Sequence, residues 1–290
     1  MKIRPIDRTL GAVVSEIDLA QPLDPAHEAA IVDAVGHRGV LEFVDQSLSA
    51  RQLRDFAARF GELEVNVANT AQEPDLPEVM TLSNIVVDGR PVGLADAGQD
   101  WHTDMSYSRQ VAFANILYAL EVPHRDGRPL GSTEFSDMHA AYEALPADLK
   151  QRLEGMTIEH DFDLFWERMR ARPGSRRAPL TPAQRAARPP VSHPVFPTHP
   201  ITGKRVLYAN PGYSTRINEL PESESRRVLD FLFEHQLRPE FRYAHAWRVH
   251  SVLMWDNVAT IHKAIADYGP GERRLIKRCQ VAATRFPALR

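Results

Sequence analysis

The first sixty residues combine two kinds of apolar spacing. Short apolar runs predict strands over residues 11–19 and 40–44. Apolar residues three or four positions apart predict helices over residues 25–36 and 49–60. Ser49 is a suitable N-cap for the second helix, because its hydroxyl can accept a hydrogen bond from a free backbone N–H of the first turn.

From residue 79 onward the chain becomes rich in short strands. Mixed apolar spacing, interrupted by Gly and Pro, is typical of a β-sandwich or barrel. The predicted strands cover residues 79–87, 106–107, 112–120, 131–135, 205–208, 252–255 and 275–283, and the predicted helices cover residues 138–145 and 222–235. Without an internal repeat or a flexible Gly/Ser linker, residues 1–290 are expected to form a single domain.

An insert at about residues 163–194 departs from this pattern. Its central part, residues 168–190, contains seven arginines, several prolines and no acidic residue. This composition is too polar for a core. The insert is either a solvated, mobile loop or an active-site lid that attracts an anionic substrate. Nucleic-acid binding is disfavoured, because no aromatic residues interleave with these arginines.

The composition limits the remaining possibilities. A net charge of −3 gives no overall attraction to nucleic acid or to an anionic membrane, and no apolar run is long enough to span a bilayer. Cys279 is the only cysteine, so a disulfide framework and a cysteine-based metal site are excluded. We therefore expect a reduced, cytoplasmic protein in which any metal is held by histidines and carboxylates.

Residues 100–104, with the sequence Asp-Trp-His-Thr-Asp, suggest such a metal site. On a strand, His102 and Asp104 would point to the same face and could reach one point. Two histidines and one carboxylate on one face of an ion, with the other positions open, are the ligands of oxygen-activating iron enzymes. The alternative is a surface strand on which both side chains are merely solvated.

His262 is the best candidate for the third ligand. It follows the apolar strand predicted over residues 252–255, and in a closed barrel residues distant in sequence can face each other across the interior. The other histidines are weaker candidates, because they lie on predicted helices, in polar surroundings or in loops without a carboxylate at ligand spacing.

Residues 272–278 bring several cations together near the C-terminus. Strand alternation places Arg274 and Arg278 on one face and Arg273 and Lys277 on the other. Two guanidinium groups on one buried face are costly without anions to pair with. A dicarboxylate co-substrate or an anionic substrate would give them bidentate partners. Otherwise both arginines point to solvent or pair with local acidic residues.

Several blocks of residues carry a family resemblance. They are residues 101–104, 131–135, 140–145, 199–204, 210–217 and 255–257, together with His262, Arg274 and Arg278. In this order they resemble the iron(II)/2-oxoglutarate dioxygenases of the taurine and 2,4-dichlorophenoxyacetate type (TauD/TfdA), from about residue 6 to about residue 284. The resemblance implies a mainly β fold with flanking helices, a double-stranded β-helix or jelly-roll barrel similar to that of the cupins.

The resemblance also implies roles for individual residues. His102, Asp104 and His262 match the Fe(II) ligands, and Thr133 with Arg274 matches the pair that holds the distal carboxylate of 2-oxoglutarate. In a further match, Arg278 corresponds to the arginine near the open iron positions, which meets the substrate's anionic group or the C1 carboxylate of 2-oxoglutarate. The implied reaction consumes O₂, converts 2-oxoglutarate to succinate and CO₂, and hydroxylates a substrate C–H. The presence of Asp104 favours hydroxylation over halogenation.

The substrate expected from this resemblance is a small organic anion, either a carboxylate or a sulfonate. The candidate pocket residues are Asn66, Asn69, Trp166, Tyr213 and Arg278. Taurine itself is not expected, because the two asparagines stand where the taurine enzymes carry other polar or aromatic contacts. Cleavage of an aryloxyalkanoate or an alkylsulfate is an open alternative.

Two other classes of protein use similar residues. A cupin-like hydrolase or isomerase would bind zinc or manganese at the same three residues but would have no use for Thr133 and Arg274. A non-catalytic barrel would have no need for an intact ligand set. The resemblance further implies a homo-oligomer, a dimer or tetramer, whose partners are small molecules rather than nucleic acid or membrane.

Overall fold

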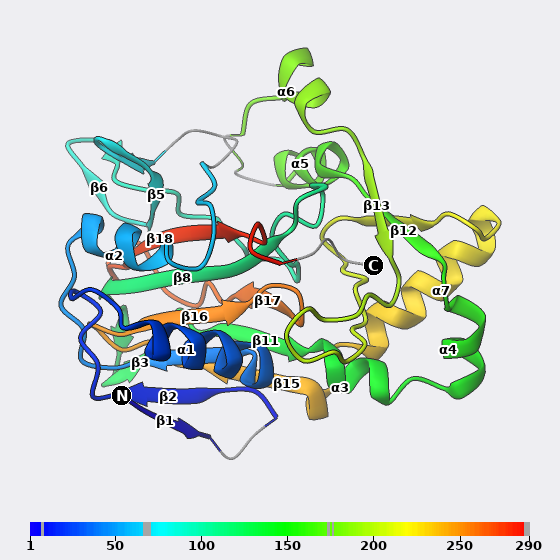
Figure 1. Cartoon of the computed structure of the whole chain (residues 1–290). Coiled ribbons are helices and arrows are strands. Elements are labelled where there is room, and N and C mark those ends of the chain that lie inside the picture. Colours follow the sequence, from blue (N-terminus) through cyan, green and yellow to red (C-terminus); the bar gives the residue numbers. More distant parts are fainter. Residues whose placement is uncertain (7–8, 66–70, 173–174, 176, 287–290) are drawn as a thin grey trace.

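The computed structural model describes residues 1–6, 9–65, 71–172, 175 and 177–286. Its larger sheet has eight strands in the order β1-β2-β3-β16-β8-β18-β5-β4 (Figure 1). In that order the strands are Lys2–Pro5, Ala12–Ser15, Val40–Phe43, Val252–Asp256, Ala112–Glu121, Leu275–Ala282, Leu76–Ser83 and Gln72–Glu73. Antiparallel pairing predominates, and only β2 and β3 run parallel.

A second sheet of three strands, in the order β15-β11-β17, faces the larger one. Its strands are Arg242–His245, Thr133–Asp137 and Thr260–Ala264. A third sheet contains β13 (Val191–Pro194), β12 (Thr157–His160) and β14 (Ser214–Ile217). Two short hairpins complete the strands: β6–β7 (Val86–Val87 and Arg90–Pro91) and β9–β10 (His124–Arg125 and Arg128–Pro129).

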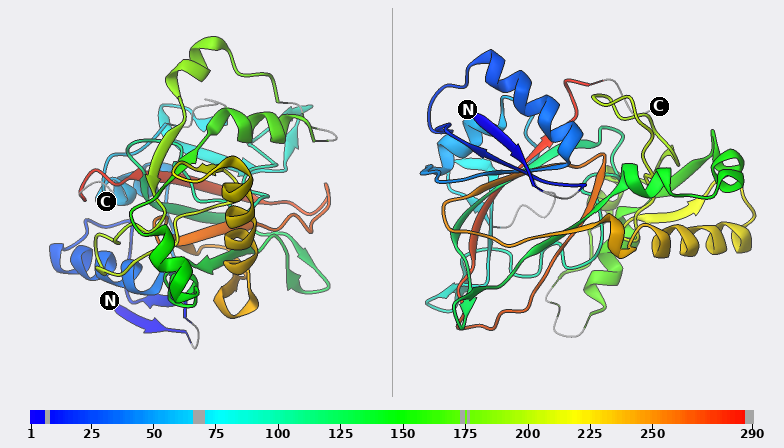
Figure 2. Two further views of the ribbon diagram at one scale, coloured as in Figure 1. Left: turned by 90° about the vertical axis from the view of Figure 1, so that its right-hand side faces the viewer. Right: turned by 90° about the horizontal axis from the view of Figure 1, so that it is seen from below.

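The helices cover the outside of these sheets. They are α1 (Pro25–Arg38), α2 (Ala50–Ala57), α3 (Met138–Glu143), α4 (Ala147–Leu153), α5 (Phe162–Arg170), α6 (Pro182–Ala187), α7 (Glu222–His235) and the 3₁₀ helix η1 (Pro239–Phe241). Figure 2 shows α1 outside the curved strands and α7 toward the other end of the molecule. Among the described residues, none of these helices has the length and apolar character needed to cross a bilayer.

Strand β16 explains how the two sheets and the helices form one core. All five of its residues are buried, because both of its faces are covered. Val252 and Met254 belong to the cluster that the helices cover, whereas Leu253 and Trp255 belong to the cluster between the sheets. In the inner cluster, the ring centroids of Trp255 and Phe135 of β11 lie 5.4 Å apart. The interior of the barrel is therefore a packed layer, and its open end carries the polar residues.

Most of the predicted elements are confirmed. Helix α7 has the predicted bounds, α1 extends two residues beyond its prediction, and Ser49 caps α2 through a complete capping box. The strand predicted over residues 79–87 is divided into β5 and β6.

Two predicted strands are wrong. Residues 106–107 lie in a turn, because Met105 adopts a left-handed φ of 57° and interrupts the extended backbone. Residues 206–208 are buried but form no ladder, and Arg205 makes only an isolated bridge to Thr198. Their N–H groups bond to several different segments: Val206 donates to Pro197 O, Leu207 to Met138 O and Tyr208 to Val195 O.

A buried polar pair fixes the turn between β16 and β17. Asp256 Oδ2 lies 2.7 Å from His199 Nε2, and both side chains are completely inaccessible to solvent. The other carboxylate oxygen of Asp256 accepts the N–H groups of Val258 and Ala259. The loop containing His199 thereby holds the turn that leads into β17.

We predict that His199→Leu lowers the free energy of unfolding by about 1–3 kcal/mol, because it leaves a buried oxygen of Asp256 without a donor. Urea denaturation followed by circular dichroism measures this change. His199→Gln keeps a donor and should recover part of the loss. Equal stabilities of the two variants would show that the hydrogen bond is unimportant.

Candidate metal and co-substrate site

A backbone bridge brings two of the predicted ligands together. His102 N donates to His262 O at 3.0 Å, and His262 N donates to His102 O at 2.8 Å. This isolated pair joins the loop after residue 98 to β17 of the smaller sheet. The two imidazole rings lie 4.3 Å apart, so main-chain hydrogen bonds set the spacing of the two side chains.

Asp104 reaches the same point from a turn. Its Oδ1 lies 3.6 Å from His102 Nε2, and its Oδ2 lies 3.7 Å from His262 Nε2. One ligand atom from each of the three residues lies within 4.8 Å of the others. The predicted regular strand through His102 and Asp104 is wrong, since His102 alone forms a bridge and Asp104 begins the turn at Met105.

Carboxamides from the larger sheet hold Asp104 in place. Asn115 of β8 donates to Asp104 Oδ2 at 3.0 Å, and Asn257 donates to the carbonyl oxygen of Asp104 at 2.7 Å. Gln280 of β18 in turn donates to Asn115 Oδ1 at 3.3 Å. Sequence reasoning missed Asn115 and Gln280. A signal was present, because Asn115 is a polar residue inside an otherwise apolar run and is fully buried.

The protonation preferences of these side chains suit metal binding. Burial alone would raise the pKa of Asp104, but hydrogen bonding to His102 and the nearby charge of Arg278 outweigh it and hold the pKa well below its usual range. Burial, with repulsion from His102, holds the pKa of His262 well below 6.5. At neutral pH the carboxylate is therefore ionised, and the His262 imidazole carries a free lone pair.

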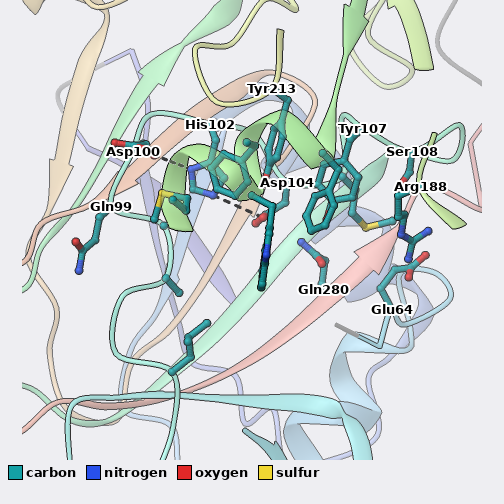
Figure 3. Close-up of a pocket in the computed structure, with 18 of the residues that line it drawn as sticks. Glu64, Gln99, Asp100, His102, Asp104, Tyr107, Ser108, Arg188, Tyr213 and Gln280 are labelled. Atoms are coloured by element: carbon teal, nitrogen blue, oxygen red, sulfur yellow. Dashed lines mark hydrogen bonds and ion pairs between the residues drawn. The ribbon is translucent and has the colours of Figure 1, made fainter. Parts of the chain in front are cut away.

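The orientation of His102 also fits a metal ligand. Its Nδ1 lies 2.7 Å from the carbonyl oxygen of Asp100 and donates to it, so Nε2 is the ring nitrogen that faces Asp104 and would give its lone pair to an ion (Figure 3). Gly212 packs against this histidine, and a Cβ at Gly212 would lie only 2.7 Å from the Cβ of His102. The close approach explains why glycine stands at position 212.

His102 and Asp104 open into a pocket of about 100 Å³, which we call the metal pocket. Arg278, on the inner side of β18, also lines it, and its Nη1 lies 3.8 Å from Asp104 Oδ2. Tyr213 and Tyr107 contribute rings whose centroids lie 4.7 Å apart. In Figure 3, Asp104 lies between His102 on one side and Tyr107 on the other.

Arg274 is a buried cation without a carboxylate partner in the described part of the chain. Burial lowers its pKa, and the ring of Tyr268 lies 5.9 Å from its guanidinium carbon. A Cβ on Gly131 would lie 3.3 Å from its Nε, which places the start of β11 beside it. The neighbouring Arg273 instead lies at the surface and pairs with Glu121 at 2.7 Å.

Thr133, two residues after Gly131, is buried on the inner side of β11. Its Oγ1 accepts a hydrogen bond from Trp247 Nε1 at 3.1 Å. Thr133 and Arg274 are thus delivered to the interior by different sheets, and an anion between them would balance the charge of Arg274.

His245 is one of the histidines that the sequence makes weaker ligand candidates, and it lies in a buried position rather than in polar surroundings or on a helix. It lies on β15 directly opposite Thr133, is buried, and its ring centroid lies 5.2 Å from that of Trp247. Its Nε2 has no hydrogen-bond partner in the described structure. The alternation of β15 could have indicated an inward-facing side chain, had this strand been predicted.

Burial lowers the pKa of His245 to about 4, below its ordinary value of 6.5. An unfolded chain binds the proton first as the pH falls, so the folded state loses stability between pH 6.5 and about 4. We predict that His245→Gln makes the free energy of unfolding less sensitive to pH in this window. Urea denaturation of metal-free protein at pH 7.5, 6 and 5 measures the slope, and identical slopes for both proteins would contradict the prediction.

The structure describes three of the five predicted substrate residues. The structure places Trp166, Tyr213 and Arg278 on the wall of the metal pocket. Asn66 and Asn69 lie outside the described residues.

The insert contains seven arginines, and those that the structure describes have different environments. Two of them, Arg177 and Arg188, line the metal pocket, and Arg176 lies outside the described residues. The remaining four bind carboxylates or carbonyls: Arg170 pairs with Glu167, Arg172 with Asp100, Arg185 with Asp163 and Glu167, and Arg168 donates to the carbonyls of Pro211 and Gly212.

Comparison with known proteins agrees with this site. Residues 2–280 match the family model "Taurine catabolism dioxygenase TauD, TfdA family". Pentalenolactone F synthase of Streptomyces avermitilis is 34% identical over 280 residues, which are 93% of this chain and 90% of that protein. The alpha-ketoglutarate-dependent 2,4-dichlorophenoxyacetate dioxygenase of Cupriavidus pinatubonensis is 34% identical over 285 residues. The match covers 94% of this chain and 95% of that protein.

A solved structure agrees as well. The crystal structure of AAD-2 in complex with Mn(II) and N-oxalylglycine has a TM-score of 0.81 to this chain at 30% identity, over 98% of both chains. The predicted double-stranded β-helix fold is confirmed. Fold and site together define a 2-oxoglutarate-dependent dioxygenase that acts on a small-molecule substrate. The chain belongs to the TauD/TfdA family.

Proposed function

We propose that this dioxygenase holds Fe(II) through His102, Asp104 and His262 and hydroxylates a small organic anion, a carboxylate or a sulfonate. The observation that carries the metal assignment is the convergence of two imidazole Nε2 atoms on one ionised carboxylate, with the three ligand atoms within 4.8 Å. Two histidines and one carboxylate leave open positions on the ion for the co-substrate and O₂.

The bound ion would supply the binding and reduction of O₂, coupled to the conversion of 2-oxoglutarate into succinate and CO₂. The side chains of the chain act by position and charge. Asn115 and the backbone bridge hold the ligands, and Tyr107 and Tyr213 line the pocket with their rings. Burial raises the pKa of both tyrosines well above 10, so both phenols stay protonated and neutral beside the carboxylate of Asp104.

Thr133 and Arg274 are the proposed clamp for the distal carboxylate of 2-oxoglutarate. Support comes from the cost of burying a guanidinium group without a counter-ion, which a dicarboxylate would relieve. A hydroxyl and a guanidinium group together match the two oxygens of one carboxylate. The position of Arg278 beside Asp104 suits the other end of the co-substrate or the anionic group of the prime substrate.

An anionic substrate is supported by the charges around the metal pocket. Arg177, Arg188 and Arg278 line it, and Arg188 has no ion-pair partner among the described residues. The insert at residues 163–194 would then act as a lid over the metal pocket, since it contributes Trp166 and two arginines to the wall of that pocket. We propose that the lid and the barrel belong to one domain. Taurine is not the proposed substrate. A homo-oligomer and a cytoplasmic location stay predictions from the sequence.

Cleavage of an aryloxyalkanoate or an alkylsulfate is a second candidate for the same chemistry. The similarity to the 2,4-dichlorophenoxyacetate enzyme favours this candidate. The reaction differs from simple hydroxylation only in the substrate, because the carbon that is hydroxylated already carries an oxygen substituent and the product then breaks apart. A zinc- or manganese-dependent hydrolase at the same ligands is disfavoured, because it would leave the buried Arg274 without a function.

We predict that Arg274→Leu weakens 2-oxoglutarate binding about 100-fold, because a charge-assisted bidentate contact in a dry site is lost. Anaerobic titration of the Mn(II)-loaded protein by calorimetry measures this affinity. Arg273→Leu is the matched control, since Arg273 is exposed and pairs with Glu121. Equal affinities for the two variants would remove Arg274 from the proposed clamp.

Succinate release across a compound panel tests the proposed substrate class. With Fe(II), ascorbate and 2-oxoglutarate, sulfonates, aryloxyalkanoates and sulfate esters should stimulate succinate formation above the uncoupled rate. Matched neutral amides and alcohols should not, because they offer no anion to the arginines. Turnover of only neutral or cationic compounds would overturn the proposal.

A further inference from the structure

A second and larger cavity adjoins the metal pocket. Its volume is about 600 Å³, whereas the metal pocket has about 100 Å³. One wall comes from the end of β5 and the β6–β7 hairpin, including Ile85 and Pro91. The opposite wall comes from α5 and the segment before α6, including Leu180. The cavity therefore lies between the large sheet and the insert.

The two spaces share part of their lining. Leu94, Phe162, Trp166 and Arg177 line both. The guanidinium carbon of Arg177 lies 4.9 Å from the centre of the Trp166 ring, and the same arginine pairs with Asp96 at 3.0 Å. A molecule bound near the metal ligands could thus extend past these side chains into the larger cavity.

Most polar groups of the larger cavity have partners within the described structure, with Arg177 Nε as an exception. Asn84 donates to the carbonyls of Gly269 and Glu272, at 3.2 and 3.0 Å, and Ser83 Oγ donates to Arg274 O at 2.8 Å. The charges of Arg177 and Asp96 face each other. What remains for a ligand is mainly the apolar surface of side chains such as Ile85 and Leu180. Apolar surface of this kind favours a hydrocarbon body over a charged or strongly hydrated one.

From these observations we propose that the prime substrate is an organic acid with a bulky apolar body. The acid group lies at Arg278, the carbon to be oxidised lies beside the metal ligands, and the body fills the larger cavity. A volume of about 600 Å³ is within the range of pockets that bury drug-sized ligands, roughly 300–1,000 Å³. A two-carbon sulfonate would leave it empty. The inference rests on the proposed function and adds the shape of the substrate to it.

A series of acids with one head group and growing bodies tests the proposal on the unmodified protein. Ethoxyacetate, phenoxyacetate and 2-naphthoxyacetate are titrated anaerobically by calorimetry into the protein loaded with Fe(II) and 2-oxoglutarate, so binding is measured without turnover. The dissociation constant should fall about 100-fold from the smallest to the largest acid, as apolar surface is buried. Constant or decreasing affinity along the series would overturn the proposal.

A variant pair locates the effect. Ile85→Trp fills the cavity from a buried position and should weaken 2-naphthoxyacetate at least about tenfold more than ethoxyacetate. Val87→Trp is the matched control, because Val87 is exposed on the same hairpin and does not line the cavity. Equal effects of Ile85→Trp on both acids, or no effect on either, would contradict the assignment of the body to this cavity.

The outcomes separate this inference from the proposed function. If 2-oxoglutarate does not bind to the metal-loaded protein, the proposed function fails and the inference fails with it. If naphthyl compounds without an acid group bind as tightly as 2-naphthoxyacetate, the anionic substrate class fails while the cavity assignment stands. If all acids bind alike and 2-oxoglutarate binds normally, only the cavity assignment fails.

Discussion

Two reciprocal backbone hydrogen bonds between His102 and His262 are the constraint on which the rest of the site depends. They join a loop to β17 at a single residue pair, and they hold the two imidazoles 4.3 Å apart. Asp104 can then complete a three-ligand face from the turn that follows. Because main-chain bonds set this spacing, the two histidine side chains would need little reorganisation to hold an ion.

The surrounding layers serve this arrangement. Asp256 and His199 fix the turn into β17, and Asn115 of the opposite sheet fixes the carboxylate of Asp104. Buried polar groups of this kind are stable only when each has a partner. Arg274 is buried without a carboxylate in the described structure, and the ring of Tyr268 lies beside it. A ligand that supplies an anion would balance its charge, which is why we propose Arg274 for the co-substrate end of the barrel.

The sequence predicted the fold class and the helices best where apolar spacing was strong, as in α1 and α7. Strand alternation predicts that His102 and Asp104 reach one point, and they do, but not on a regular strand, because Met105 in the left-handed region ends the extended backbone after Asp104. Strand alternation can place His245 and Asn115 on an inner face, but it does not predict what they contact. Their roles depend on which residues lie opposite them on other strands, and such pairings between distant segments are set by tertiary structure rather than by local spacing. The second cavity likewise arises from the contact of the insert with a hairpin far away in the sequence.

The most direct test of this account is the visible absorption spectrum of the protein with Fe(II) and 2-oxoglutarate in the absence of oxygen. Chelation of the ion by 2-oxoglutarate should give a weak charge-transfer band in the wild-type protein. The band should be absent from His102→Ala, which keeps the fold because the backbone bridge does not use the side chain. A wild-type protein that binds iron without this band, or a His102→Ala variant that retains it, would contradict the central assignment.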